Sequence, residues 1–104
     1  MTTTARELPH PDLSEVELPA VLFALSDPAR LELVRGLAAG GELTVAQCQA
    51  QGRDVPKSTF SHHLKTLREA GLIRNDPAGR QRTVTLRRAE LDERFPGLLD
   101  AVLG

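Results

Sequence analysis

Two long stretches of the chain carry apolar residues at the spacing of an α-helix. Side chains three or four positions apart in a helix share one face. One stretch follows Ser26 and Asp27, either of which can cap a helix with Pro28 in its first position, and it stops at Gly40. The apolar positions are Leu31, Val34 and Leu37 in this stretch, and Phe60, Leu64 and Leu67 in the second stretch. Each is therefore predicted to be a helix that buries one face, and the second is expected to stop at Gly71, a residue suited to a left-handed turn.

Shorter helices are predicted before each of these two. The sequence "AVLFAL" follows Pro19, a residue that favours the first helical position. Thr44 and Gln47 have the spacing of a capping box, and Gly52 follows as a stop residue. Only a short connector, "RDV", then leads into the helix that begins near Pro56. This order of short helix, connector and helix predicts a helix-turn-helix unit.

Beyond Gly71 the apolar spacing changes to that of a strand. Val84 and Leu86 alternate with polar residues in "RTVTLR", and "LIRND" stands before the turn "PAGRQ". Alternation beside such a turn predicts a two-stranded β-hairpin. A short turn and a last helix from Pro96 are expected to complete the chain. The predicted fold class is mainly α, a winged helix-turn-helix with a two-stranded β-hairpin wing.

The 104 residues are expected to form one domain behind a short arm. Residues 1–13 contain two prolines and little apolar sequence, which predicts a mobile N-terminal arm, and residues 14–104 form the domain. No apolar run approaches the roughly 18 residues that a membrane span needs. The single cysteine cannot form an intramolecular disulfide. A protein of the reduced cytoplasm, without a membrane partner, is expected.

Charge is strongly segregated along the chain, although the formal net charge is only -1. Residues 1–52 hold 3 basic and 7 acidic side chains, residues 53–88 hold 9 and 3, and residues 89–104 hold 1 and 4. A basic block between two acidic ones can attract a polyanion to one face of a protein. Charge alone would fit a solvated face equally well. Because the block contains the second long helix and the hairpin of the predicted winged helix-turn-helix, double-stranded DNA is the expected partner.

The polar face of the second long helix suits both parts of a DNA duplex. Hydroxyl and imidazole groups can pair with base edges, whereas Lys and Arg contact phosphates. In a helix-turn-helix, the second helix enters the major groove with its N-terminal residues on the bases. We assign base contacts to Ser58, Thr59, Ser61 and His62, and phosphate contacts to Lys57, Lys65, Arg68, Arg80 and Arg82.

Two segments carry a resemblance to a known family. The sequences "LSDPARLELVRGLA" and "KSTFSHHLKTLREAGLI", followed by a basic hairpin, resemble the ArsR-type winged helix-turn-helix transcriptional repressors over about residues 18–88. The resemblance implies a homodimer, joined mainly through its first and last helices, that represses transcription at an inverted-repeat operator. It also implies that DNA is faced by Ser58, Thr59, Ser61, His62 and Lys65.

The first and last helices carry more apolar surface than so small a domain is expected to bury alone. A surplus of this kind is covered in many proteins by a second copy of the chain. The residues that we expect at this dimer interface are Val21, Leu22, Leu25, Leu98, Leu99, Val102 and Leu103.

The chain departs from the metal-sensing members of the family. Thr44 and Ala46 stand where many members have the two thiolates of a Cys-Val-Cys motif, and no histidine follows His63 that could hold zinc in the last helix. His62 and His63 point about 100° apart on a helix, which prevents them from chelating one ion. No metal and no cofactor are therefore expected, and the sequence does not identify an inducer.

Cys48 lies three residues after Val45 on an apolar helix face, which favours a buried structural thiol. Two alternatives stay open: a thiol-responsive regulator that uses Cys48, and a winged-helix module that binds another protein. An enzyme is not expected. The sequence has no glycine-rich phosphate loop, paired-carboxylate site or metal motif, and a triad of Cys48, a histidine and Asp54 would need Cys48 to face outward.

Overall fold

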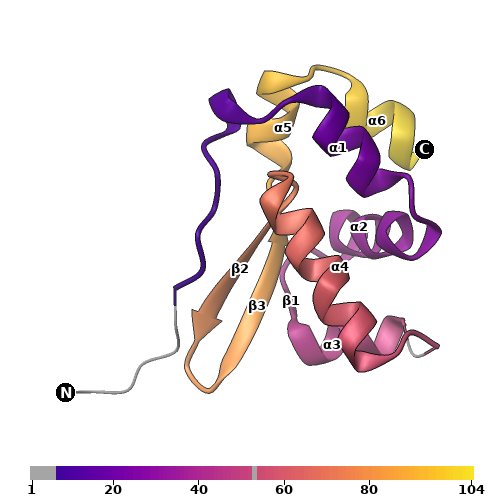
Figure 1. Cartoon of the computed structure of the whole chain (residues 1–104), viewed down its shortest axis with the longest axis vertical. Coiled ribbons are helices and arrows are strands. Elements are labelled where there is room, and N and C mark those ends of the chain that lie inside the picture. The colour runs from indigo at the N-terminus through magenta and orange to yellow at the C-terminus, as the bar shows by residue number, and fades with distance from the viewer. Residues whose placement is uncertain (1–6, 53) are drawn as a thin grey trace.

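The computed structural model describes residues 7–52 and 54–104. The hairpin tip and the start of α4 lie at one end of the molecule, and α1, α5 and α6 lie at the other (Figure 1). In chain order the elements are η1 (Leu13–Glu15, a 3-10 helix), α1 (Leu18–Leu25), α2 (Pro28–Gly40), β1 (Leu43–Thr44), α3 (Val45–Gln51), α4 (Lys57–Glu69), β2 (Ile73–Ala78), β3 (Gln81–Leu86), α5 (Arg88–Arg94) and α6 (Leu98–Leu103).

The sheet has three antiparallel strands in the order β1-β3-β2. The predicted hairpin is confirmed as β2 and β3, with Ile73 opposite Leu86 at its base. The additional strand β1 places Leu43 opposite Val84. Its two residues are too few to show an alternating pattern, so the sequence gives no signal for this strand. The wing is therefore tied to the helix-turn-helix through the residues just before α3.

The helix caps follow the sequence signals. Asp27 Oδ2 accepts hydrogen bonds from the backbone N–H groups of Ala29 and Arg30 at 2.9 and 3.1 Å, which caps α2. At α3, the N–H of Gln47 donates to Thr44 Oγ1 at 3.0 Å and the N–H of Thr44 donates to Gln47 Oε1 at 2.8 Å. The predicted capping box is thus confirmed, and it fixes the start of α3.

α4 ends in a Schellman motif at Gly71. Gly71 has a φ of 81° and its N–H donates to Arg68 O at 3.0 Å, while the N–H of Leu72 donates to Leu67 O at 3.0 Å. These two bonds satisfy carbonyls that the helix end leaves open. Leu72 and Leu67 are both fully buried. The stop predicted at Gly71 is confirmed, and it sends the chain directly from α4 into the wing.

The N-terminal segment contacts the domain at several positions between residues 7 and 13, within the predicted arm. Leu13 is buried, and the carbonyl of Pro9 accepts a hydrogen bond from Arg68. Arg87 Nη1 donates to Pro11 O at 2.8 Å. Figure 1 shows this segment running beside β2. Residues 1–6 of the predicted arm lie outside the described residues.

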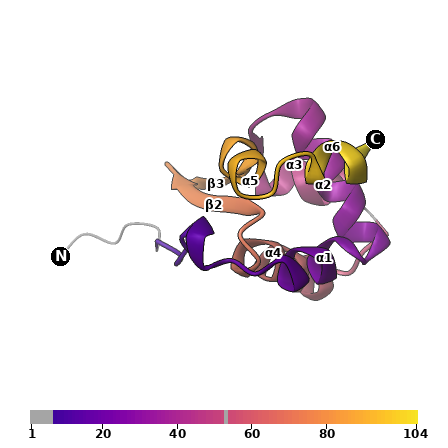
Figure 2. The same ribbon diagram turned by 90° about the horizontal axis from the view of Figure 1, so that it is seen from above.

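The C-terminal part also differs from the prediction. The expected short turn is the helix α5, which ends where the N–H of Phe95 donates to Leu91 O. The last helix begins at Leu98, not at Pro96, because Gly97 adopts a left-handed conformation with a φ of 81° as its N-cap. Seen from above, α5 and α6 lie on the opposite side of the molecule from α4 (Figure 2).

Substitution of Gly71 tests the packing at the end of α4. A Cβ at Gly71 would meet Val16 Cγ2 at 2.7 Å, whereas a Cβ at Gly79, whose φ is also positive, would meet nothing within 4 Å. Gly79→Ala should lower the free energy of unfolding by about 1–2 kcal/mol through left-handed strain alone. Gly71→Ala should cost about 1–3 kcal/mol more because it also overpacks a buried contact. Equal losses in urea denaturation would contradict this account.

Candidate nucleic-acid interface

The outer face of α4 gathers most of the side chains assigned to DNA. The helix packs on the core through Phe60, Leu64 and Leu67, as its apolar spacing predicts. This packing leaves the polar positions between them on the accessible side. The structure exposes Lys57, Ser58, Thr59, Ser61, His62 and Lys65. The candidate base contacts and both lysines are therefore accessible to a bound molecule.

The first turn of α4 leaves backbone N–H groups open. The helix begins at Lys57, and its N-cap Pro56 has no side chain that could accept a hydrogen bond. The N–H groups from Lys57 to Thr59 have no intrahelical acceptor, as at any helix start. They lie at the positive end of the helix dipole, where anions bind favourably.

The position of Arg68 departs from its predicted role. Only 7% of this residue is exposed, and its Nη1 donates to Pro9 O at 2.7 Å. The guanidinium therefore fastens the N-terminal segment to α4. A side chain held this way is not available to a phosphate, so we remove Arg68 from the candidate interface.

The tip of the wing presents one of its two predicted arginines. Arg80 is exposed and makes no hydrogen bond or ion pair with the residues that the structure describes. Arg82 is partly buried, and its Nε donates to Asn75 Oδ1 at 2.8 Å and its Nη2 to Asn75 O at 3.0 Å. Arg82 thus joins β3 to β2, which differs from the prediction that it extends outward from the tip.

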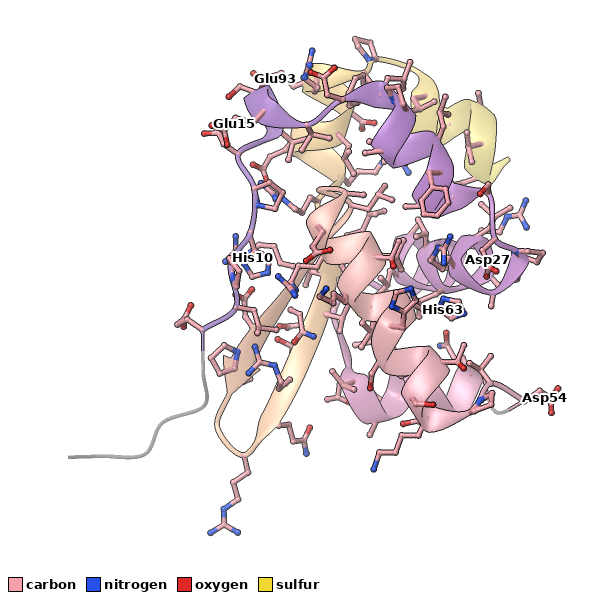
Figure 3. All side chains as sticks on the ribbon, viewed as in Figure 1. His10, Glu15, Asp27, Asp54, His63 and Glu93 are labelled. Carbon is pink, nitrogen blue, oxygen red and sulfur yellow. The ribbon has the colours of Figure 1, made fainter. Side chains whose placement is uncertain are left out.

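A buried network that the sequence analysis missed holds α4 on the start of α2. Arg30 Nε donates to Ala24 O at 2.7 Å, and Arg30 Nη1 lies 3.2 Å from His63 Nδ1. A guanidinium can only donate, so Nδ1 accepts and the neutral imidazole carries its proton on Nε2. This Nε2 lies 3.8 Å from Asp27 Oδ2, and Figure 3 shows the two residues close together.

A second histidine fixes the N-terminal segment to the edge of the sheet. His10 Nε2 accepts a hydrogen bond from the backbone N–H of Asn75 at 3.0 Å, and Figure 3 shows His10 beside β2. Since β2 is an outer strand, this N–H points away from the sheet. Burial, and then the charge of Arg74, lower the pKa of His10. Burial is also the main cause that lowers the pKa of His63, against the opposing effect of Asp27.

Cys48 is fully buried, which confirms its predicted structural position. Burial raises the pKa of its thiol to about 11. The reactive form of cysteine is the thiolate, and a thiol with this pKa is protonated near neutral pH. The structure therefore gives no support to the alternative of a thiol-responsive regulator based on Cys48.

The predicted dimer surface is divided between core and exterior. Val21, Leu25 and Leu99 are buried within a single chain, since the inner faces of α1 and α6 pack on the core. They are not surplus surface, and we remove them from the candidate interface. The remaining positions are the exposed Leu22 and the partly buried Leu98, Val102 and Leu103. α1 exposes two further large apolar residues, Leu18 at 41% and Phe23 at 65%.

Over residues 7–52 and 54–104, no group of three or more His, Cys, Asp or Glu side chains is placed to hold a metal ion. Thr44, where the resemblance described above would place a thiolate, uses its hydroxyl to cap α3. In the same described part of the chain, no helix has the length and apolar character needed to cross a membrane.

Comparison with known proteins identifies the family of this fold. A helix-turn-helix domain family matches residues 25–75. The uncharacterized HTH-type transcriptional regulator YceK of Bacillus subtilis strain 168 is 36% identical over 91 residues, which are 86% of this chain and 90% of YceK. The crystal structure of an ArsR family transcriptional regulator is 26% identical, covers 81% of this chain and 90% of its own, and has a TM-score of 0.67. The chain belongs to the ArsR-type winged helix-turn-helix regulators.

The transcriptional repressor BigR from Xylella fastidiosa is a further relative of this ArsR-type regulator. It is 28% identical, with 81% of this chain and 84% of BigR covered and a TM-score of 0.62. These relatives are transcriptional regulators, which points away from an enzyme. In this family fold, α3 and α4 form the helix-turn-helix and β2 and β3 form the wing.

The two acceptor histidines of this ArsR-type regulator predict a pH-dependent stability. Their folded pKa values lie below 6.5, so the unfolded chain binds more protons once the pH falls below about 6.5. The free energy of unfolding should therefore decrease as the pH falls from 7 to 5. His10→Gln and His63→Gln can still accept but do not titrate, so each should flatten this slope in urea denaturation. A double variant with the full wild-type slope would contradict the prediction.

Proposed function

We propose that this ArsR-type regulator is a homodimer that represses transcription by binding an inverted-repeat operator. The observation that carries the proposal is the accessible N-terminal half of α4, with its hydroxyls, His62 and open N–H groups. A helix of this kind can enter the major groove, where base edges are distinguishable. A dimer on such a site would occupy DNA that the transcription machinery needs.

In this proposal, one set of residues contacts the bases and another set contacts the phosphates. Base contacts belong to Ser58, Thr59, Ser61 and His62, while Lys57, Lys65 and Arg80 contact phosphate. Lys65 Nζ lies 3.5 Å from Glu69 Oε2, but both side chains are well exposed. An exposed pair of this kind contributes little energy, so Lys65 can exchange its partner for a phosphate. Two α4 helices related by a two-fold axis would meet half-sites about one helical turn apart.

Single substitutions distinguish the residues that contact bases from those that contact phosphates. Ser61→Ala or His62→Ala should weaken operator binding by about 1–3 kcal/mol and relax the preference at one base position, with binding to random DNA little changed. Arg80→Ala should weaken operator and random DNA alike and reduce the salt slope by about one unit. Fluorescence anisotropy over a salt series measures both quantities.

Arg35→Ala is the matched control, because Arg35 is an exposed arginine of α2, outside the first half of α4 and the tip of the wing, and it pairs with Glu32 and donates to Leu103 O at 3.4 Å. It should leave both affinities and the salt slope unchanged. If the α4 variants kept the wild-type base preference while Arg80→Ala changed it, the assignment of base contacts to α4 and of a phosphate contact to Arg80 would be wrong.

The dimer is proposed to form through α1 and α6. Leu18, Leu22 and Phe23 expose apolar surface on α1, and a second copy of the chain would remove it from water. α6 lies at the same end of the molecule as α1 (Figure 1), on the side away from α4 (Figure 2). With a two-fold axis at this end, the two copies of α4 face away from the interface and toward DNA.

Charge on α1 tests this interface. The wild type should sediment as a dimer at micromolar concentration, and Leu18→Glu or Leu22→Glu should shift it to a monomer because each buries an unpaired carboxylate. Ala46→Glu, at an exposed position of α3, is the control and should remain a dimer. A monomeric wild type would remove the proposed interface.

A further inference from the structure

A cavity of about 420 Å³ lies within the helix-turn-helix unit. Its walls come from α2, α3, the connector before α4, and α4 itself. The apolar part is formed by Leu33, Cys48, Val55 and Phe60. A volume of this size lies in the range of small-molecule sites, which are mostly apolar with a few placed polar groups. The cavity is distinct from the outer face of α4 that is proposed to meet DNA.

The ionisable side chains of the described cavity lining are neutral or already paired. Glu32 Oε1 and Arg35 Nη1 lie 2.7 Å apart and compensate each other's charge. Burial raises the pKa of the Cys48 thiol and lowers the pKa of the His63 imidazole, which keeps both uncharged near neutral pH. An anionic ligand that took Arg35 would displace Glu32 and leave its carboxylate beside the same opening, so the described lining offers no surplus of opposite charge to offset the lost hydration. The cavity therefore suits an uncharged molecule.

Two polar side chains on the lining have hydrogen-bonding capacity left. His63 Nδ1 is occupied by Arg30, while the Nε2–H lies 3.8 Å from its nearest carboxylate, beyond hydrogen-bond distance. The Gln51 amide makes no hydrogen bond with the described residues. Its Oε1 lies 2.6 Å from where a Cβ on Gly36 would stand, so the missing side chain of Gly36 allows this amide to lie against α2.

We propose that the cavity binds a small uncharged organic molecule with an apolar ring or chain and one hydrogen-bond acceptor oxygen, and that this molecule weakens operator binding. The apolar part contacts Leu33, Val55 and Phe60, and the oxygen accepts from His63 or Gln51. Cys48 is fully buried behind this lining and forms no bond with the ligand, because its thiol is protonated. The effect on the operator rests on the proposed function, whereas binding in the cavity does not.

The link to DNA follows from where the cavity lies. Phe60 and His63 line it from one side of α4, one turn or less from Ser61 and His62 on the outer side. The proposed ligand binds more tightly when the start of α4 is displaced from α2, since only such a preference lets it shift the helix. Since the base contacts come from this same turn, the displacement moves them out of register with the groove. By reciprocity, operator DNA must lower the affinity for the ligand by the same factor.

The binding test compares acetophenone with benzoate as ligands of the protein without DNA. Acetophenone is uncharged and has an aromatic ring with one carbonyl oxygen, whereas benzoate has a similar size and a negative charge. In two-dimensional NMR without DNA, millimolar acetophenone should shift the amide signals of Gly36, Cys48, Gln51 and Gly52, and benzoate should not. Absence of these shifts with acetophenone, or equal shifts with benzoate, would overturn the proposal.

Cavity-filling variants locate the site. Ala29→Leu and Val55→Phe add volume to the lining from α2 and from the connector, and each should abolish the acetophenone shifts. Ala46→Leu adds the same volume as Ala29→Leu at an exposed position of α3 and should bind like the wild type. Two cavity-filling variants are used so that the test still works if one of them misfolds. Unchanged binding in a folded filler would place the ligand elsewhere and overturn the proposal.

The operator test uses the same probe. Saturating acetophenone should weaken operator binding of the wild type at least about fivefold, a typical allosteric coupling, and leave Ala29→Leu unaffected. An unchanged operator affinity in the wild type would overturn the regulatory part. Failure of the proposed function looks different, since the protein would then not select any DNA sequence while the acetophenone shifts in the free protein remained.

Discussion

The left-handed turn at Gly71 is the constraint on which the geometry of this protein depends. It ends α4 after Glu69 and starts β2 at Ile73, so the helix proposed to contact the bases and the wing share one short corner. Val16 packs against the bare Cα of Gly71, which brings the N-terminal segment to the same corner. A Cβ at this position would strain the backbone and displace Val16 together. Gly71 therefore fixes the corner between α4 and the wing, together with the pairing of β1 and β3 that ties the wing to α3.

Several arginines of the basic block at residues 53–88 form hydrogen bonds within the protein, so they are not all available to a polyanion. Arg68 and Arg87 donate to carbonyls of the N-terminal segment, and Arg82 joins the two strands of the wing. Arg74 is held by both oxygens of Asp76 at 2.9 and 3.0 Å. A charge count along the sequence assigns all of these to the DNA-facing field. The structure leaves a smaller set, with Arg80 at the tip and two lysines on α4.

Much of the fold could be predicted because its signals are local. Asp27, Thr44 and Gly71 each define a helix boundary through contacts a few residues away, and the stripe from Phe60 to Leu67 defines the buried face of α4. The errors concern partners far apart in the chain. Arg68 contacts Pro9, and Arg30 contacts His63, and no spacing rule links such residues. Leu99 is apolar like the neighbouring residues that were predicted at the dimer interface. Its burial in the core depends on tertiary packing, which the sequence pattern does not show.

The comparisons establish the family, and the accessible face of α4 gives that family fold its candidate reading surface. The central claim is that DNA meets the first half of α4 and the tip of the wing. Amide chemical-shift mapping of the labelled protein with a selected operator duplex tests this claim most directly. The account predicts the largest changes from Lys57 to His62 and at Arg80, with the exposed face of α1 unaffected by DNA. Changes centred on α1 or α6, with α4 unperturbed, would contradict it.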